Sequence, residues 1–139
     1  MYMAEKIKSK GILLLAVFVT IFGVLTLKSG GDVLFFSEEA RLAAGNFVPF
    51  VLWSNFIAGF FYILTGIGIF TGKKWSINLA VALAVFTAGL FLAFGLHIFS
   101  GGLYETRTVG AMVLRTSVWI ASAVILVKFG NKYFSSALT

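Results

Sequence analysis

The sequence has no cysteine, one histidine and one proline, and few of its residues carry a charge. Without cysteine, the chain cannot form disulfides, thiolate zinc sites or iron–sulfur clusters, and it has no thiol nucleophile. A single histidine excludes a bis-histidine haem within one chain and cannot assemble a metal site of usual composition. The sequence therefore predicts no metal site and argues against haem as a cofactor.

Charge is scarce because most of the chain is apolar. Of the 139 residues, 60% are hydrophobic and 12% are charged, whereas soluble domains average about 45–50% apolar and about 25% charged residues. This composition indicates an integral membrane protein in contact with the lipid bilayer. The formal charge of +6 does not indicate nucleic-acid binding, because the lysines flank the apolar runs.

Four apolar runs predict an all-α protein, a membrane four-helix bundle forming a single domain over residues 1–139. Each run is close to the about 20 residues that cross about 30 Å of hydrocarbon. The first run lacks the small-residue cleavage pattern of a signal peptide, so we expect it to be a true span. The predicted spans are 11–27, 47–70, 76–99 and 108–128.

Lysine and arginine outside these spans are unequally distributed, and loops rich in these residues stay in the cytoplasm. Both termini and the turn near residue 73 are therefore predicted to be cytoplasmic, in a bacterial inner membrane. The predicted inner side carries Lys6, Lys8, Lys10, Lys73, Lys74, Lys128 and Lys132, and the outer side carries Lys28, Arg41 and Arg107.

The long connection between the first two spans contains the signals of a short helix. Ser37 suits the N-cap, Glu38 and Glu39 suit the first turn, and Gly45 suits the C-terminal stop. The apolar residues beside them predict that this helix rests on the outer membrane interface. Pro49 then fits the opening turn of the second span, where a missing N–H costs least.

Arg115 is the most unusual residue, because a guanidinium at the centre of a membrane helix costs about 2.5–3.5 kcal/mol on insertion scales. It lies about 10 Å inside the outer end of the last span, at 1.5 Å per residue, and Asn55 and Thr20 are predicted at similar depth. We expect its partner to be Glu39, Glu105 or Asn55. The arginine then either pairs structurally with the outer loop, binds an anionic or carbonyl-bearing ligand in an outward-opening pocket, or snorkels to the headgroups.

His97 is predicted two residues from the outer end of the third span. It is either an interfacial histidine bonded to loop backbone or a hydrogen-bond or proton donor to a quinone-like carbonyl.

Several stretches resemble DoxX-like small membrane proteins. They are "FGVLTLKSGG", "SEEARLAAGNFVPF" and "FIAGFFYILTGIGIFTGKKW", followed by a third span ending at His97 and by "GGLYE". The resemblance implies a four-helix bundle and an association with quinone or sulfur-linked redox chemistry.

Two classes of function remain open. The first is a redox- or quinone-associated accessory subunit or enzyme with an outer-leaflet pocket; the second is an oligomeric anion or small-solute transporter or channel. A purely structural subunit of a larger complex is a third reading, and a homo-oligomer or such a complex is the expected assembly. No catalytic residue is assigned, and a quinone is the cofactor considered. The predicted polar cluster comprises Arg115, Asn55, Thr20, His97, Glu39 and Glu105.

The predicted orientation is testable by cysteine labelling, because the chain has no cysteine of its own. A cysteine replacing Lys74 should not react with a membrane-impermeant thiol reagent added from outside intact cells. Reaction from outside would show that the orientation is wrong.

Overall fold

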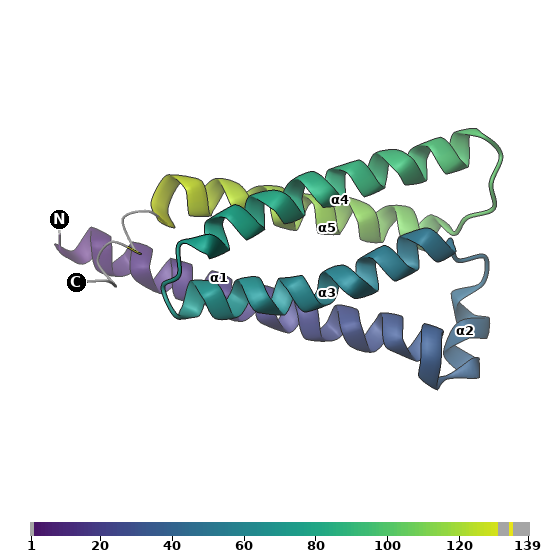
Figure 1. Cartoon of the computed structure of the whole chain (residues 1–139), viewed down its shortest axis with the longest axis horizontal. Coiled ribbons are helices and arrows are strands. Elements are labelled where there is room, and N and C mark those ends of the chain that lie inside the picture. Colours follow the sequence, from purple (N-terminus) through teal and green to yellow (C-terminus); the bar gives the residue numbers. More distant parts are fainter. Residues whose placement is uncertain (1, 131–133, 135–139) are drawn as a thin grey trace.

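The computed structural model describes residues 2–130 and 134, with side chains from residue 10 onward, so Lys132 lies outside the described residues. This part of the chain is all-α, as predicted. Figure 1 shows four long helices arranged as a bundle. They are α1 (Tyr2–Gly31), α3 (Pro49–Phe70), α4 (Trp75–Phe99) and α5 (Thr106–Ile125); the π-helical turns η1 (Asp32–Phe36) and η2 (Leu126–Gly130) extend α1 and α5, and α2 (Glu38–Ala44) is a short helix between the first two spans.

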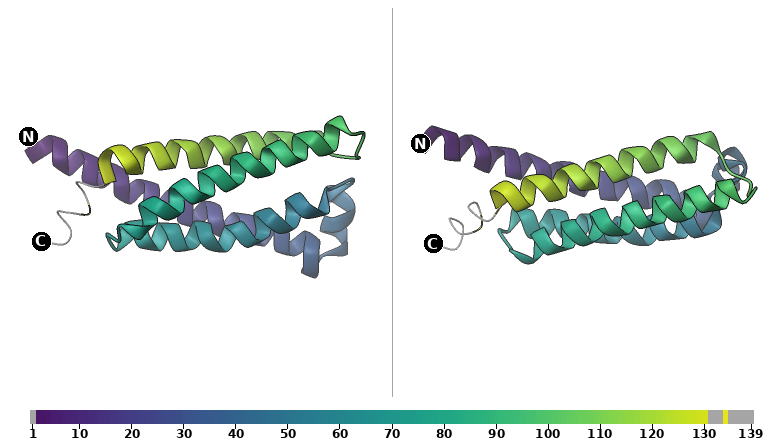
Figure 2. Two further views of the ribbon diagram at one scale, coloured as in Figure 1. Left: turned by 45° about the horizontal axis from the view of Figure 1, so that its top comes forward. Right: turned by 90° about the horizontal axis from the view of Figure 1, so that it is seen from above.

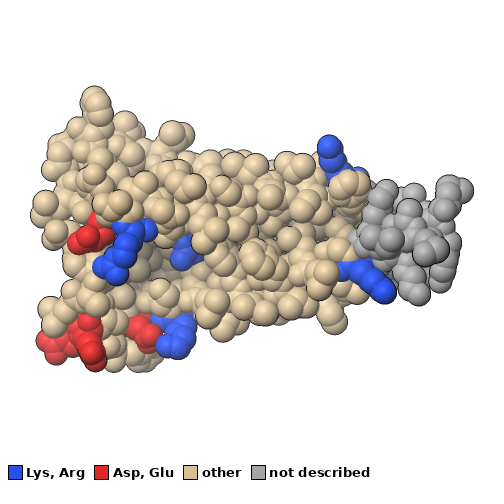
Figure 3. Space-filling view, turned by 180° about the vertical axis from the view of Figure 1, so that it is seen from behind, with Lys and Arg blue, Asp and Glu red and all other residues tan. Residues whose placement is uncertain are grey.

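All four long helices are long and apolar enough to cross a membrane. Large apolar side chains also point away from the protein, among them Leu14 at 70% and Phe99 at 92% exposure, which suits contact with lipid. In Figure 3 the acidic side chains gather at one end of the molecule, and a broad uncharged belt separates them from lysine or arginine at the other. The protein is therefore a multi-pass integral membrane protein.

The bundle has two distinct ends (Figures 1 and 2). The described terminal segments and the α3–α4 turn lie at one end. The opposite end carries the α4–α5 loop and residues 32–48, which we call the lid, and we refer to it as the lid end. Helix α1 packs most closely against α3, and α4 packs against both α3 and α5. Helices α1 and α5 are not a closely packed pair, so side chains bridge the space between them.

Glycines allow α1 and α3 to approach closely. A Cβ atom added to Gly66 would collide with the Thr20 hydroxyl and lie 3.0 Å from the Ala16 carbonyl oxygen. A Cβ added to Gly23 on α1 would lie 3.0 Å from the Gly59 carbonyl oxygen on α3. In a membrane the hydrophobic effect does not drive helices together, so helices associate through close van der Waals packing, which small residues at the contact allow.

Two groups of buried side chains fill the bundle. The larger runs from the terminal end to mid-bundle and includes Tyr62 and Trp119, both without exposed surface. The smaller lies toward the lid end and includes Val51, Phe94 and Met112.

Helix α1 continues farther than the sequence pattern predicted. Instead of ending near residue 27, it runs to Gly31 and then into η1. In this extension Gly30 lies close to α3, where an added Cβ would be 3.2 Å from the ring of Phe56. Lys28 and Asp32, one turn apart, form an ion pair of 3.2 Å across the junction.

The short helix of the lid is confirmed, together with its boundary signals. The Ser37 hydroxyl accepts a hydrogen bond from the Ala40 amide at 3.0 Å, and Gly45 ends the helix with φ +65°. Pro49 occupies the first turn of α3 as predicted.

The α1–α3 contact makes a direct prediction. Gly66→Ala should destabilise the folded protein by about 1–3 kcal/mol, because the new methyl group overpacks a close helix contact. Unfolding by SDS in mixed micelles would measure the loss. The matched control is Gly89→Ala in α4, where an added Cβ meets nothing within 4 Å; equal destabilisation of both variants would contradict the packing account.

Candidate functional site

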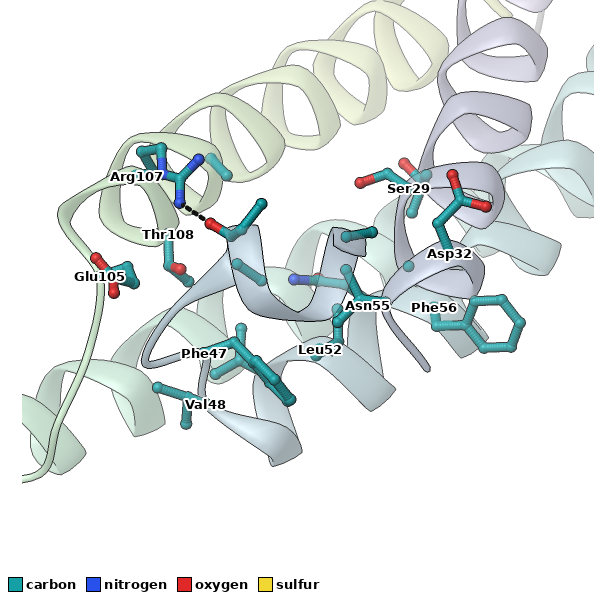
Figure 4. Close-up of a pocket in the computed structure, with 18 of the residues that line it drawn as sticks. Ser29, Asp32, Phe47, Val48, Leu52, Asn55, Phe56, Glu105, Arg107 and Thr108 are labelled. Carbon is teal, nitrogen blue, oxygen red and sulfur yellow. Dashed lines mark hydrogen bonds between the residues drawn. The ribbon is translucent and has the colours of Figure 1, made fainter. Parts of the chain in front are cut away.

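A cavity of about 440 Å³ opens at the lid end, lined by α1, α3, α5 and the lid (Figure 4). Its size falls within the about 300–1,000 Å³ typical of small-molecule pockets. Apolar side chains make up most of the wall. The polar and charged lining residues are Thr26, Ser29, Asp32, Asn55, Glu105, Arg107, Thr108 and Arg115.

The start of α5 holds the lid by two hydrogen bonds. One carboxylate oxygen of Glu105 accepts from the Asn46 amide at 2.8 Å, and Arg107 donates to the Ala43 carbonyl at 2.7 Å, drawn as the dashed line in Figure 4. Gly45 lies against the Glu105 carboxylate, where a Cβ would collide with it. The lid is therefore fixed to a helix about sixty residues away in sequence.

A second arginine stabilises the lid from within. Arg41 donates to the carbonyl oxygens of Val33 at 3.2 Å and Leu34 at 3.1 Å. These bonds join α2 to η1, the two helical segments of the lid.

Arg115 lines the cavity and faces the bundle. One of its terminal nitrogens donates to the Thr26 hydroxyl on α1 at 2.9 Å. Its guanidinium carbon lies 5.4 Å from the centre of the Phe22 ring, within the range of a cation–π contact. Thr26 can accept this bond because its own hydroxyl proton goes to the Phe22 carbonyl at 2.8 Å.

The expected partner of Arg115 is therefore wrong: the acceptor is Thr26, and not Glu39, Glu105 or Asn55. Glu105 is directed to the lid backbone, and Glu39 is exposed on α2. Among the described residues, the ion pair is Lys28–Asp32, so Arg115 has no carboxylate within 4.0 Å.

The other predicted site residues separate into two groups. Asn55 and Glu105 line the cavity with Arg115, although the Asn55 amide donates to the Met112 sulfur at 3.4 Å. Glu39, Thr20 and His97 are absent from the cavity wall. Thr20 donates to the Ala16 carbonyl at 2.7 Å and packs at the α1–α3 contact.

His97 closes the α4–α5 loop. One ring nitrogen lies 2.9 Å from the Leu103 carbonyl oxygen, and the ring meets Phe50 edge-on with centroids 5.9 Å apart. Gly102 leaves room for this ring, since a Cβ there would collide with it. The bond to Leu103 matches the loop-bonded interpretation of this histidine.

Sequence reasoning missed Thr26 and Phe22. Thr26 stood at the edge of the predicted first span, whereas the extension of α1 places it five residues inside the helix end at Gly31. The available signal was the i,i+4 spacing of Phe22 and Thr26, which puts both on one helix face.

No family model, curated protein or solved structure matches this chain. The resemblance to DoxX-like proteins therefore holds for the architecture of four membrane-length helices, and the family is not shown.

The lid contacts predict a change in protease sensitivity. Glu105→Ala should accelerate tryptic cleavage after Arg41 by about two- to tenfold, because it removes a hydrogen bond of about 0.5–1.5 kcal/mol that fixes the lid. Digestion of the purified protein in nanodiscs would measure the rate. Glu105→Gln keeps an acceptor oxygen and should cleave at nearly the wild-type rate; equal rates for wild type and Glu105→Ala would contradict the clamp.

Proposed function

We propose that the protein binds a small ligand in the lid-end cavity through Arg115, and that the ligand presents a carbonyl or anionic oxygen. A quinone is the leading candidate, which would make the protein a redox-associated membrane subunit or a quinone-handling enzyme. The observation that carries the proposal is a guanidinium within a membrane-length helix that lines a cavity and has no carboxylate partner among the described residues.

The hydrogen-bonding capacity of Arg115 supports this proposal. A guanidinium has five N–H donors, and one hydrogen bond is formed by this side chain, to a neutral hydroxyl. Its Nε–H group is buried and has no partner. A ligand oxygen would satisfy donors that the protein leaves unpaired, and burying a charge without such compensation is costly.

The shape and lining of the cavity favour an amphiphilic ligand. Phe47, Phe56 and Leu52 line the walls together with Asn55, as seen in Figure 4. An apolar body with one polar oxygen, as in a quinone, fits an apolar wall with a few placed donors. We further propose that the lid end faces outward, on the basis of the lysine asymmetry, so that the cavity lies in the outer leaflet.

The transport alternative has less support. A path across the membrane needs available polar groups through its full thickness, but the hydroxyls of Thr65 and Thr87 bond to carbonyls of their own helices. Thr65 donates to the Phe61 carbonyl at 2.7 Å, and Thr87 donates to the Leu83 carbonyl at 2.6 Å. Such internal bonds favour a pocket open on one side.

The proposal predicts the behaviour of Arg115 variants. Arg115→Met should bind a short-chain benzoquinone or decanoate at least about tenfold more weakly than wild type, since a hydrogen bond to a charged group is worth about 1.5–3 kcal/mol. Binding to protein in nanodiscs, by equilibrium dialysis against empty nanodiscs, would measure the difference.

The matched control is Arg107→Met, which removes a second guanidinium from the cavity wall but one that bonds to the lid backbone. It should loosen the lid and weaken probe binding less than Arg115→Met. Unchanged affinity of both probes in folded Arg115→Met would refute the proposed function.

A further inference from the structure

Among the residues that the structure describes, four buried polar atoms have no hydrogen-bond partner: Tyr62 Oη, Arg115 Nε, Thr116 Oγ1 and Trp119 Nε1. The side chains of Tyr62 and Trp119 have no exposed surface. Buried polar groups are nearly always paired, so four orphans in one protein need an explanation.

These groups form one cluster. Arg115, Thr116 and Trp119 lie within about one turn on the inward face of α5, because residues three and four apart share a face. The ring centroids of Tyr62 on α3 and Trp119 are 4.8 Å apart, and Phe22 on α1 stacks on Tyr62 with a centroid distance of 5.6 Å. Since the Arg115 guanidinium carbon lies 5.4 Å from the centre of the Phe22 ring, contacts through Phe22 and Tyr62 join Arg115 to Trp119, and Thr116 lies next to Arg115 on α5.

The cluster consists mainly of hydrogen-bond donors. The Arg115 Nε–H and Trp119 Nε1–H groups can only donate, while the two hydroxyls can donate or accept. A partner shared by the two N–H groups must therefore be an acceptor, and the positive charge of Arg115 makes an oxygen the best match.

We propose that this donor cluster is a second binding site, for an acceptor oxygen, formed by residues beside Arg115 that do not line the cavity. Because the rings around the site are in contact, with centroids 4.8 and 5.6 Å apart, the occupant has to be small, such as one water or a single oxygen-bearing group. The oxygen comes either from water or from the end of a ligand that reaches past Arg115. The second source rests on the proposed function, and the first does not.

The indole N–H of Trp119 reports directly on this site. In protein with ¹⁵N-labelled tryptophan in nanodiscs, Trp119→Phe identifies its NMR signal among those of three tryptophans. Transfer of magnetisation from water to this N–H, without added probe, would identify water as the occupant. A shift of the signal with decanoate or a short-chain benzoquinone, abolished by Arg115→Met, would identify a ligand oxygen.

Tyr62→Phe removes one hydroxyl from the cluster while keeping the ring. It should shift the Trp119 signal, and it should weaken probe binding about two- to tenfold if the ligand supplies the oxygen. Trp53→Phe, at an exposed position on α3, should leave the Trp119 signal unchanged.

A Trp119 N–H that has no water contact and responds to neither probe would overturn the second site. That result would leave the proposed function intact if the probes still bind through Arg115. Conversely, water contact at Trp119 without any probe binding would support the second site and refute the ligand-binding function.

Discussion

The positive charge of Arg115 inside a membrane bundle is the constraint on which the site depends. A guanidinium at this depth needs acceptors, and simulations and insertion scales agree that leaving it in hydrocarbon is costly. The protein supplies one hydroxyl from Thr26 and the face of Phe22. Both partners are neutral, so the charge itself remains uncompensated by the described residues, and the cavity beside it becomes the natural place for an oxygen-bearing ligand.

The rest of the lid end positions this charge. Close packing of α1 with α3, and of α5 with α4, leaves the space between α1 and α5 to be bridged by side chains. The lid covers that space and is held by Glu105 and Arg107, two charged residues whose bonds go to lid backbone. Because Arg115 contacts Thr26 and Phe22 of α1, Glu105 and Arg107 form their hydrogen bonds with the lid and not with Arg115.

Local sequence signals predicted most of the fold. Apolar runs of membrane length predicted the four spans. Ser37 and Gly45 marked the ends of α2, and Pro49 marked the start of α3, because capping and turn preferences depend on a few adjacent residues. The extension of α1 to Gly31 was not predictable in this way, since the residues beyond 27 have no apolar pattern of their own and one of them, Gly30, packs against Phe56 of another helix.

The site could be predicted in part. Arg115 was identifiable from its cost in an apolar run, and depth along each helix grouped it with Asn55, which also lines the cavity. Its partner was not identifiable, because the rotation of α1 and α5 relative to each other decides which side chains meet. Depth along the first span was the reason for predicting Thr20 in the polar cluster. In the structure, Thr20 instead packs where α1 closely approaches α3 at Gly66.

Photocrosslinking within the cavity tests the central claim most directly. A diazirine amino acid at Ala111, which lines the cavity, should capture in intact membranes a small molecule of defined mass that carries a carbonyl or acidic group. The same amino acid at Gly110, which faces open space, should capture only bulk lipid. Identical lipid adducts at both positions, with no additional molecule at Ala111, would contradict a ligand-binding cavity at Arg115.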